Sequence, residues 1–304
     1  MKRKILTALI VSAMTVSIAS GCGKKTEPEP EPVQEASVEE SVQEEPAAPL
    51  ESTTEETTIE EASPTSLDDA LGLAVLQYND QWFDQGECSG EGHILLDREG
   101  NDSKGEQICY CLTTYGRYEF QDGNFVCCAG NGVIPCVIRV ALNEEGEYSM
   151  DSLEPAPDGS NFVDWVKDNF PEKYWSRCIT VEEDDRVELE RQQNAYAEEY
   201  LSYIGREDAD VGSYGDYEHE LLTDAGVKVE VSNAMLDVQS GDSFEKNCPF
   251  WLGEREVIEQ DGRYIYKTEY DKKKGQIIFS KSEYDTGEIL MKSVYSAKTG
   301  DKVE

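Results

Sequence analysis

Histidine is scarce in this chain, and the motifs that would give it a catalytic role are missing. Only two of the 304 residues are histidines, His93 and His219. The HExxH signature of zinc peptidases is absent, because His219-Glu220 is followed by Leu-Leu-Thr. A histidine-rich zinc site is not supported either. The sequence therefore favours neither a metallopeptidase nor a histidine-bound metal centre.

Basic residues are also few. Lysine and arginine together number 27 against 64 aspartates and glutamates, and the formal net charge is −37 at pH 7. Nucleic acids and anionic lipid headgroups attract proteins through clustered lysine and arginine. We therefore expect no nucleic-acid partner. Acidity of this kind is typical of exported domains, because the net charge keeps them soluble.

Long apolar runs are missing except at the N-terminus. Three basic residues precede the run from Ile5 to Ile18, and the small residues Ala19-Ser20-Gly21 separate it from Cys22. This layout predicts a signal peptide over residues 1–22, because the run is shorter than the about 20 apolar residues of a membrane span. The tripeptide with Cys22 resembles the lipobox of bacterial lipoproteins. An ordinary secretory signal with an incidental cysteine is the alternative.

The lipobox resemblance implies where in the cell the protein is located. The sulfur of Cys22 would receive a diacylglycerol group, and the cysteine would become the mature N-terminus. Two acyl chains such as palmitate, at about 0.8 kcal/mol per buried methylene, anchor a protein stably to a bilayer. We therefore expect a lipid-anchored protein on the extracytoplasmic face of the cell membrane, whose first partner is the membrane itself.

Residues 23–66 contain no aromatic residue and almost no aliphatic one. They hold 13 glutamates and six prolines. Such a segment cannot bury enough apolar area to offset the entropy of ordering it. We expect a disordered, acidic linker that lifts a folded domain off the membrane. An acidic tail without a spacing role is the alternative.

Helical and strand periods alternate over residues 67–205 and predict an α+β domain. Ser66 is typical of a helix N-cap, and apolar residues at helical spacing predict a helix over 67–84. Further helices are expected over 161–169 and 182–203. Branched and aromatic segments between turn formers predict an antiparallel meander with strands at 92–96, 107–118, 123–128, 133–142 and 148–153. We expect the helices to pack on one side of this curved sheet.

The polar, glycine-rich stretch 206–218 predicts a linker to a second, smaller β-rich domain over 219–304. A short helix is expected at 233–238. Turns containing glycine then separate four apolar segments, which predict a second β-meander with strands at 254–259, 263–270, 276–284 and 289–296.

Eight cysteines follow Cys22, and an even number in an exported protein suggests disulfides. Buried reduced thiols and a metal site are the alternatives. Cys109 and Cys111 share one face of a predicted strand, unlike the Cys-x2-Cys spacing of a zinc knuckle. If the turn at Asp122-Gly123 keeps a regular register, Cys109 faces Cys136 at about 4.5–5.5 Å, within disulfide range. We therefore name Cys109 and Cys136 as a candidate disulfide.

Short segments scattered over the exported part resemble a known family. They include Gly92-His93-Ile94-Leu95, Ile134-Pro135, Glu154-Pro155-Ala156-Pro157, Pro249-Phe250-Trp251-Leu252-Gly253 and Asp261-Gly262-Arg263-Tyr264. Together they are similar to the extracytoplasmic region of antirepressor-type, beta-lactam-sensor-like membrane proteins of Firmicutes. The resemblance implies a Gram-positive source and a sensing or interaction module that has lost the family's membrane-embedded peptidase.

Catalytic motifs are present only in fragments. Ser243-Phe-Glu-Lys246 and Lys298-Thr299-Gly300 match two motifs of penicillin-binding enzymes, but they lie only about fifty residues apart, too close for that fold. Asp97, Glu99 and Asn101 mimic the start of a calcium loop that lacks glycine at its sixth position and glutamate at its twelfth. We expect no catalytic residue, no metal and no cofactor.

Three functions stay open at this point. The anchor, the spacer and the resemblance favour a non-enzymatic cell-envelope lipoprotein that senses a signal or binds an unidentified envelope protein. A glycan- or small-molecule-binding lipoprotein of the cell wall is the alternative, and it requires a pocket lined by exposed aromatic residues such as Trp251. Aromatic residues at strand and helix spacing are more often core. An enzyme is the third, without a recognisable nucleophile and base.

Overall fold

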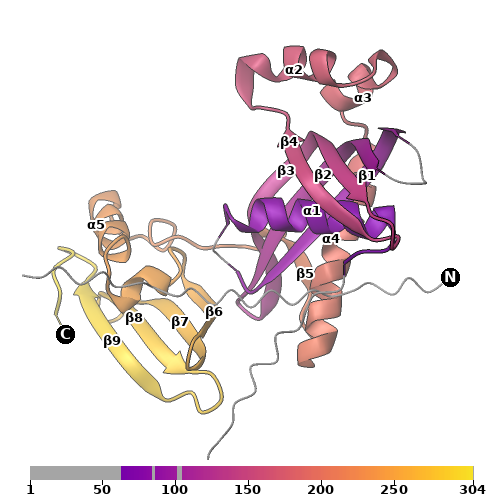
Figure 1. Ribbon diagram of the computed structural model, residues 1–304. Coiled ribbons are helices and arrows are strands. Elements are labelled where there is room, and N and C mark those ends of the chain that lie inside the picture. The colour runs from indigo at the N-terminus through magenta and orange to yellow at the C-terminus, as the bar shows by residue number, and fades with distance from the viewer. Residues whose placement is uncertain (1–62, 84–85, 101–104, 304) are drawn as a thin grey trace, which may run out of the picture. The chain divides into compact units, whose positions relative to one another are not determined.

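The computed structural model describes residues 63–83, 86–100 and 105–303 (Figure 1). The predicted signal peptide with Cys22 and the predicted spacer up to residue 62 lie outside the described residues. The described residues belong to one compact unit. No helix in these ranges combines the length and apolarity needed to cross a bilayer.

Nine strands of the described chain form one sheet, in the order β4-β3-β2-β6-β7-β8-β9, with β1 added to β2 and β5 added to β3. All neighbours are antiparallel except β3 and β5. The strands are β1 (Cys88–Glu99), β2 (Gly105–Gln121), β3 (Asn124–Leu142), β4 (Tyr148–Pro155), β5 (Val211–Ser213), β6 (Gly253–Glu259), β7 (Gly262–Asp271), β8 (Gln276–Glu283) and β9 (Ile289–Ser296). The predicted α+β class, with a β-meander after the helices, is confirmed.

Helices lie before the first strand and between β4 and β6. They are α1 (Leu67–Asp80), α2 (Phe162–Asn169), α3 (Trp175–Ile179), α4 (Glu183–Ile204) and α5 (Val229–Gln239), with short 3-10 turns at Gly159–Asn161, Glu172–Tyr174, Tyr214–Asp216 and Phe244–Asn247. The predicted N-cap is confirmed, because the Asp69 backbone N–H donates to Ser66 Oγ at 3.0 Å. The stretch expected as a linker contains β5, and the division into two domains stays a prediction.

Strand β3 runs without interruption through a stretch that we expected to be a turn. Gly130-Asn131-Gly132 lies inside the strand, next to two register shifts in its ladder with β2. A Cβ on Gly130 would lie 2.2 Å from the Tyr115 carbonyl oxygen. The glycine therefore allows the close backbone approach of a β-bulge and does not reverse the chain.

Because of the bulges in β3, the cysteines pair in a different register from the one that we expected. The pairing expected from the Asp122-Gly123 turn holds only as far as Tyr118 and Cys127. Beyond the two shifts Cys136 faces Cys111, and Cys109 faces Ile138. The expected opposition of Cys109 and Cys136 is therefore wrong by two residues. All eight cysteines of the described chain are free thiols in the structure.

The helices pack on both faces of the sheet, not on one (Figure 1). Along β2, Cys109 and Cys111 belong to a core cluster with α1. The alternate residues Tyr110 and Leu112 point to the other face and join a cluster with α2, α3 and Leu189 of α4. Sequence periodicity gives the apolar face of a helix but not the side of the sheet on which the helix packs.

Glycines let α4 approach the backbone of β1 and β2 closely. A Cβ on Gly92 would lie 2.3 Å from the Leu189 carbonyl oxygen, and one on Gly90 would lie 2.4 Å from that of Gln193. A Cβ on Gly116 would meet the Gln193 side chain at 2.4 Å. The helix therefore rests directly on a surface of bare backbone.

Replacing Gly92 by alanine tests this contact. Because the added methyl group meets backbone and not a movable side chain, we expect Gly92→Ala to lower the free energy of unfolding by about 2–3 kcal/mol. Gly132→Ala is the matched control, since its Cβ would have no neighbour within 4 Å. Denaturant unfolding that finds equal stability for the two variants would contradict the packing.

Candidate binding cleft at the end of strand β2

The C-terminal end of β2 joins the first part of the sheet to the β6–β9 meander. Gln121 pairs with Arg255, and the Asp122 N–H donates to the Glu254 carbonyl oxygen at 3.0 Å. The Asp122 carboxylate accepts from the Glu254 N–H at 2.8 Å and from the Trp251 indole N–H at 3.2 Å. Asp122 thus connects the end of β2 to residues 251–254, at the start of the meander.

A buried ion pair reinforces this junction. The Arg255 guanidinium donates from Nε and Nη2 to the two carboxylate oxygens of Glu119, at 2.8 and 2.6 Å. The side chain of Glu119 is only 6% exposed. Gln121 donates to the same carboxylate at 2.7 Å, and Arg255 also donates to the Asn247 carbonyl oxygen at 3.3 Å. Both charges are therefore paired and hydrogen-bonded, as burial requires.

Aromatic rings form a wall beside the ion pair. Tyr214 and His219 stack with centroids 3.9 Å apart, and Trp251 meets the His219 ring edge-on at 4.8 Å. Phe250 contacts Trp251 edge-on at 5.1 Å. His219 is fixed by a hydrogen-bonding contact between its Nε2 and Gln121 Oε1 at 2.9 Å. The wall is thus built on the same end of β2.

A cleft of about 370 Å³ lies against this wall, within the usual size range of small-molecule sites. Its lining combines residues of β2 and β3 with residues of α5 and of the loop 246–251. Three large hydrophobic side chains of the lining are exposed, Phe250 at 48%, Leu236 at 46% and Tyr214 at 37%. Lys246 is exposed at the cleft, and no residue of the described chain engages its ammonium group. The cleft thus offers apolar surface together with one positive charge that no described residue pairs.

The two cysteine thiols in the cleft lining are not activated as nucleophiles. Burial raises the pKa of Cys248 to about 12 and raises the pKa of Cys128 further above its usual range. A thiol is nucleophilic only as the thiolate, so neither sulfur is activated at neutral pH. Neither cysteine of the cleft is therefore a candidate nucleophile.

A second cluster of charged side chains joins the β6–β9 meander to the residues just before β1 and just after α4. Arg263 donates to Glu87 and to Glu256, and Arg206 also binds Glu256. Arg206 lies over the Phe120 ring at 4.1 Å. Burial raises the pKa of Glu87, although the nearby Arg263 opposes this effect. The charges in this cluster are satisfied by one another, so we interpret it as structural.

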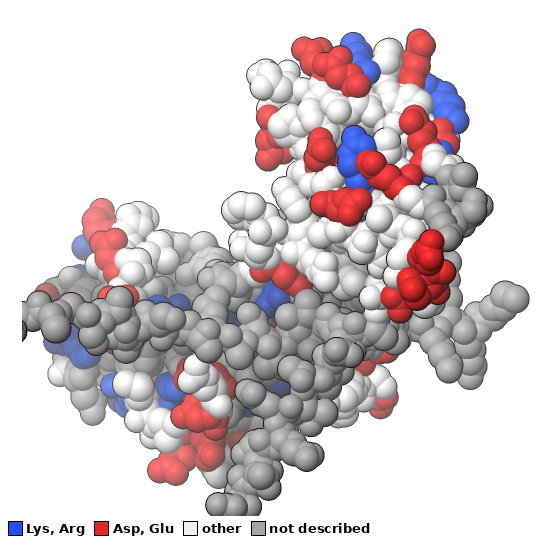
Figure 2. All heavy atoms as spheres, in the orientation of Figure 1, with Lys and Arg blue, Asp and Glu red and all other residues white. Residues whose placement is uncertain are grey.

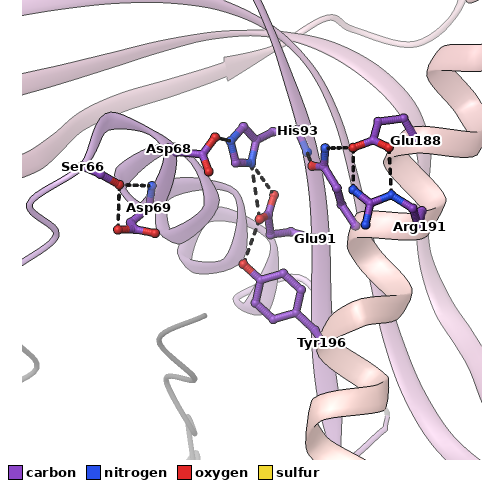
Figure 3. A network of polar contacts seen from close by, with 9 residues as sticks. Ser66, Asp68, Asp69, Glu91, His93, Glu188, Arg191 and Tyr196 are labelled. Carbon is purple, nitrogen blue, oxygen red and sulfur yellow. Dashed lines mark hydrogen bonds and ion pairs between the residues drawn. The ribbon is translucent and has the colours of Figure 1, made fainter. Parts of the chain in front are cut away.

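A third cluster surrounds His93 at the β1 edge of the sheet (Figure 3). His93 Nε2 lies 3.4 Å from an Asp68 carboxylate oxygen, and its Nδ1 lies 3.0 Å from Glu91 Oε2. The Tyr196 hydroxyl donates to Glu91 Oε1 at 2.9 Å. Asp68 belongs to α1 and Tyr196 to α4. The cluster therefore links these two helices across the edge strand β1.

The charge state of His93 follows from its partners. Burial by itself would lower the pKa of His93, but the hydrogen bonds to Asp68 and Glu91 outweigh it and raise the pKa to about 10. The imidazole is therefore protonated at neutral pH. It acts as a fixed cation between two helices, not as a general base.

The pKa of His93 gives a pH dependence of stability. Because the folded pKa lies above the unfolded value, we expect the free energy of unfolding to fall as the pH rises from about 6.5 to about 10. His93→Gln should cost about 3 kcal/mol at pH 6, since it leaves Glu91 buried without a cation, and should flatten this slope. Urea titrations at several pH values measure both effects. Equal pH slopes for wild type and variant would contradict a protonated His93.

The residues weighed from the sequence lie in several different environments. Ser243 and Lys246 belong to one turn, whereas Lys298-Thr299-Gly300 form another turn after β9. The aromatic candidate Trp251 is among the residues that line the cleft, but it is only 3% exposed. Asn101 of the calcium-like stretch lies outside the described residues. Among described residues, no three metal-binding side chains group together.

No protein-family model matches the chain, and no curated protein or solved structure matches it either. The cleft is therefore identified from its geometry alone. The resemblance to the exported region of antirepressor-type proteins stays a prediction.

Proposed function

We propose that this chain is a lipid-anchored lipoprotein of the bacterial cell envelope that acts outside the membrane as a non-enzymatic sensing module. It senses by binding a small ligand in the cleft at the end of β2, and it passes the signal to an envelope protein. The anchor rests on the lipobox-like sequence around Cys22. The binding step rests on the cleft.

One observation carries the binding step: accessible apolar surface and an unpaired ammonium line the same cleft. Phe250 and Leu236 offer the flat or apolar contact that a sugar face or a hydrocarbon chain needs. Lys246 offers a charge-assisted hydrogen bond to a carboxylate or phosphate. This combination supports an anionic ligand with an apolar face, and wall fragments that carry a carboxylate on an amino sugar fit that description.

Binding can be measured by calorimetry with N-acetylmuramic acid as the probe and the neutral sugar N-acetylglucosamine, which lacks the lactyl carboxylate, for comparison. We expect the anionic probe to bind more tightly. Lys246→Met keeps the aliphatic stem and removes the charge, so it should raise the dissociation constant of the anionic probe about tenfold. Phe250→Ala should weaken both probes.

The matched control is Lys273→Met, which removes an exposed lysine in the turn between β7 and β8. It should leave both affinities unchanged. Failure of the muramyl probe to bind, or equal weakening by Lys246→Met and Lys273→Met, would rule out the cleft as a site for this ligand class.

A further inference from the structure

Strand β9 ends the sheet and leaves part of its backbone edge open. It is the last strand in the sheet order, and only β8 pairs with it along its length. Residues 302 and 303 cover the second half of the outer edge, where the Val303 N–H donates to the Val294 carbonyl oxygen at 2.7 Å. No described residue covers the outer edge from Ile289 to Ser293.

Three consecutive apolar side chains are exposed on this open segment. Ile289 is 60% exposed, Leu290 49% and Met291 47%. The ladder with β8 passes from Ile289 directly to Met291, so Leu290 is a bulged residue without a partner in β8. Three adjacent exposed apolar residues on an open edge mark a contact surface more than an ordinary solvated strand.

The charges that flank this segment match each other about its centre. Glu288 precedes the three apolar residues and Lys292 follows them. No described residue binds either side chain. Two antiparallel copies with Leu290 facing Leu290 therefore place each Glu288 opposite Lys292 of the other copy and each Ile289 opposite Met291. We propose that the open edge of β9 is the interface of a two-fold symmetric homodimer of this chain.

A second copy fits this edge better than an unrelated strand. Charged residues on an edge strand normally prevent pairing with foreign strands. Here the charges that repel other partners become complementary under a two-fold axis through Leu290. The interface is then isologous and closes on itself, so it produces a dimer and not a fibre.

The size of the segment sets the strength of the contact. Five residues on each side bury less than the about 1,200 Å² typical of a stable interface, so the dimer is weak in dilute solution. Anchoring both copies to one membrane raises their effective concentration without adding a contact. Dimerisation goes beyond the proposed ligand binding, because it involves a surface on another element of the fold.

A zero-length crosslinker tests the predicted pairing in membranes that contain the full-length chain. A carbodiimide joins a carboxylate to an amine as an amide and takes up the water that is lost. Only an amide that joins two chains gives a covalent dimer on a denaturing gel, so the dimer band separates linkage across copies from linkage within one copy. We expect a crosslinked dimer whose linked peptides contain these two residues.

Charge exchange supplies the controls. Each single variant also removes one of the two groups that the carbodiimide joins, so the dimer fraction of the variants is measured by fluorescence energy transfer between labelled copies in vesicles. Glu288→Lys and Lys292→Glu each place like charges opposite each other twice, so each should reduce the dimer at least about fivefold. The double variant restores both ion pairs in reversed order and should restore both the dimer and the crosslink. An unchanged dimer fraction in the single variants, no restoration in the double variant, or wild-type linked peptides elsewhere in the chain would overturn the proposal. Neither side chain has a partner among the described residues, so neither change removes a contact that the structure describes.

Discussion

The buried contact between Glu119 and Arg255 is the constraint on which the candidate site depends. It lies where β2 passes from its pairing with β1 to its single bridge with β6, and it fixes the loop before β6 through Asn247. A buried ion pair gives little net stability by itself, but removing one partner costs about 3–5 kcal/mol because the other charge is left in the interior. The pair therefore acts mainly by specifying how the β6–β9 meander joins the sheet. The cleft, the aromatic wall and the position of Lys246 follow from that junction.

Helices α1 and α4 pack against β1 and β2 and support this part of the sheet. Helix α4 lies on the glycines of β1 and β2, and α1 covers the opposite face. The protonated His93 then links the two helices across the edge strand β1 (Figure 3). On the face shown in Figure 2, groups of acidic side chains are scattered among uncharged residues, together with fewer lysine and arginine side chains. Other exposed lysines, such as Lys292, also have no partner among the described residues, so Lys246 is distinguished by its position in the lining of the cleft.

The sequence was sufficient for those parts of the fold that local chemistry determines. The Ser66 cap, the α4 period and the glycine turns of the meander correspond to elements of the structure, because capping, periodicity and positive backbone angles are local properties. The strand through Gly130 and the partner of Cys136 were not predictable in this way. Both depend on β-bulges, and a bulge changes the register of every residue beyond it. The two faces used by α1 and α4 also depend on chain crossings that periodicity does not encode.

The candidate site was harder to predict than the fold. Trp251 and Lys246 were recognised individually, as an aromatic candidate and as part of a chance motif. Leu236 and the Glu119–Arg255 pair carried no local signal, because the two charged residues are 136 positions apart and meet only after the sheet has formed. An unpaired lysine becomes informative only when the partners of the other cations are known.

A double-mutant cycle on Glu119 and Arg255 tests the central claim most directly. The free energies of unfolding of the wild type, Glu119→Gln, Arg255→Met and the double variant give the coupling energy between the two side chains. If the pair joins the meander to β2, the coupling is about 2 kcal/mol or more, and the double variant is more stable than Arg255→Met alone. Additive effects, within about 0.5 kcal/mol, would show that the two residues do not act together and that the junction does not depend on them.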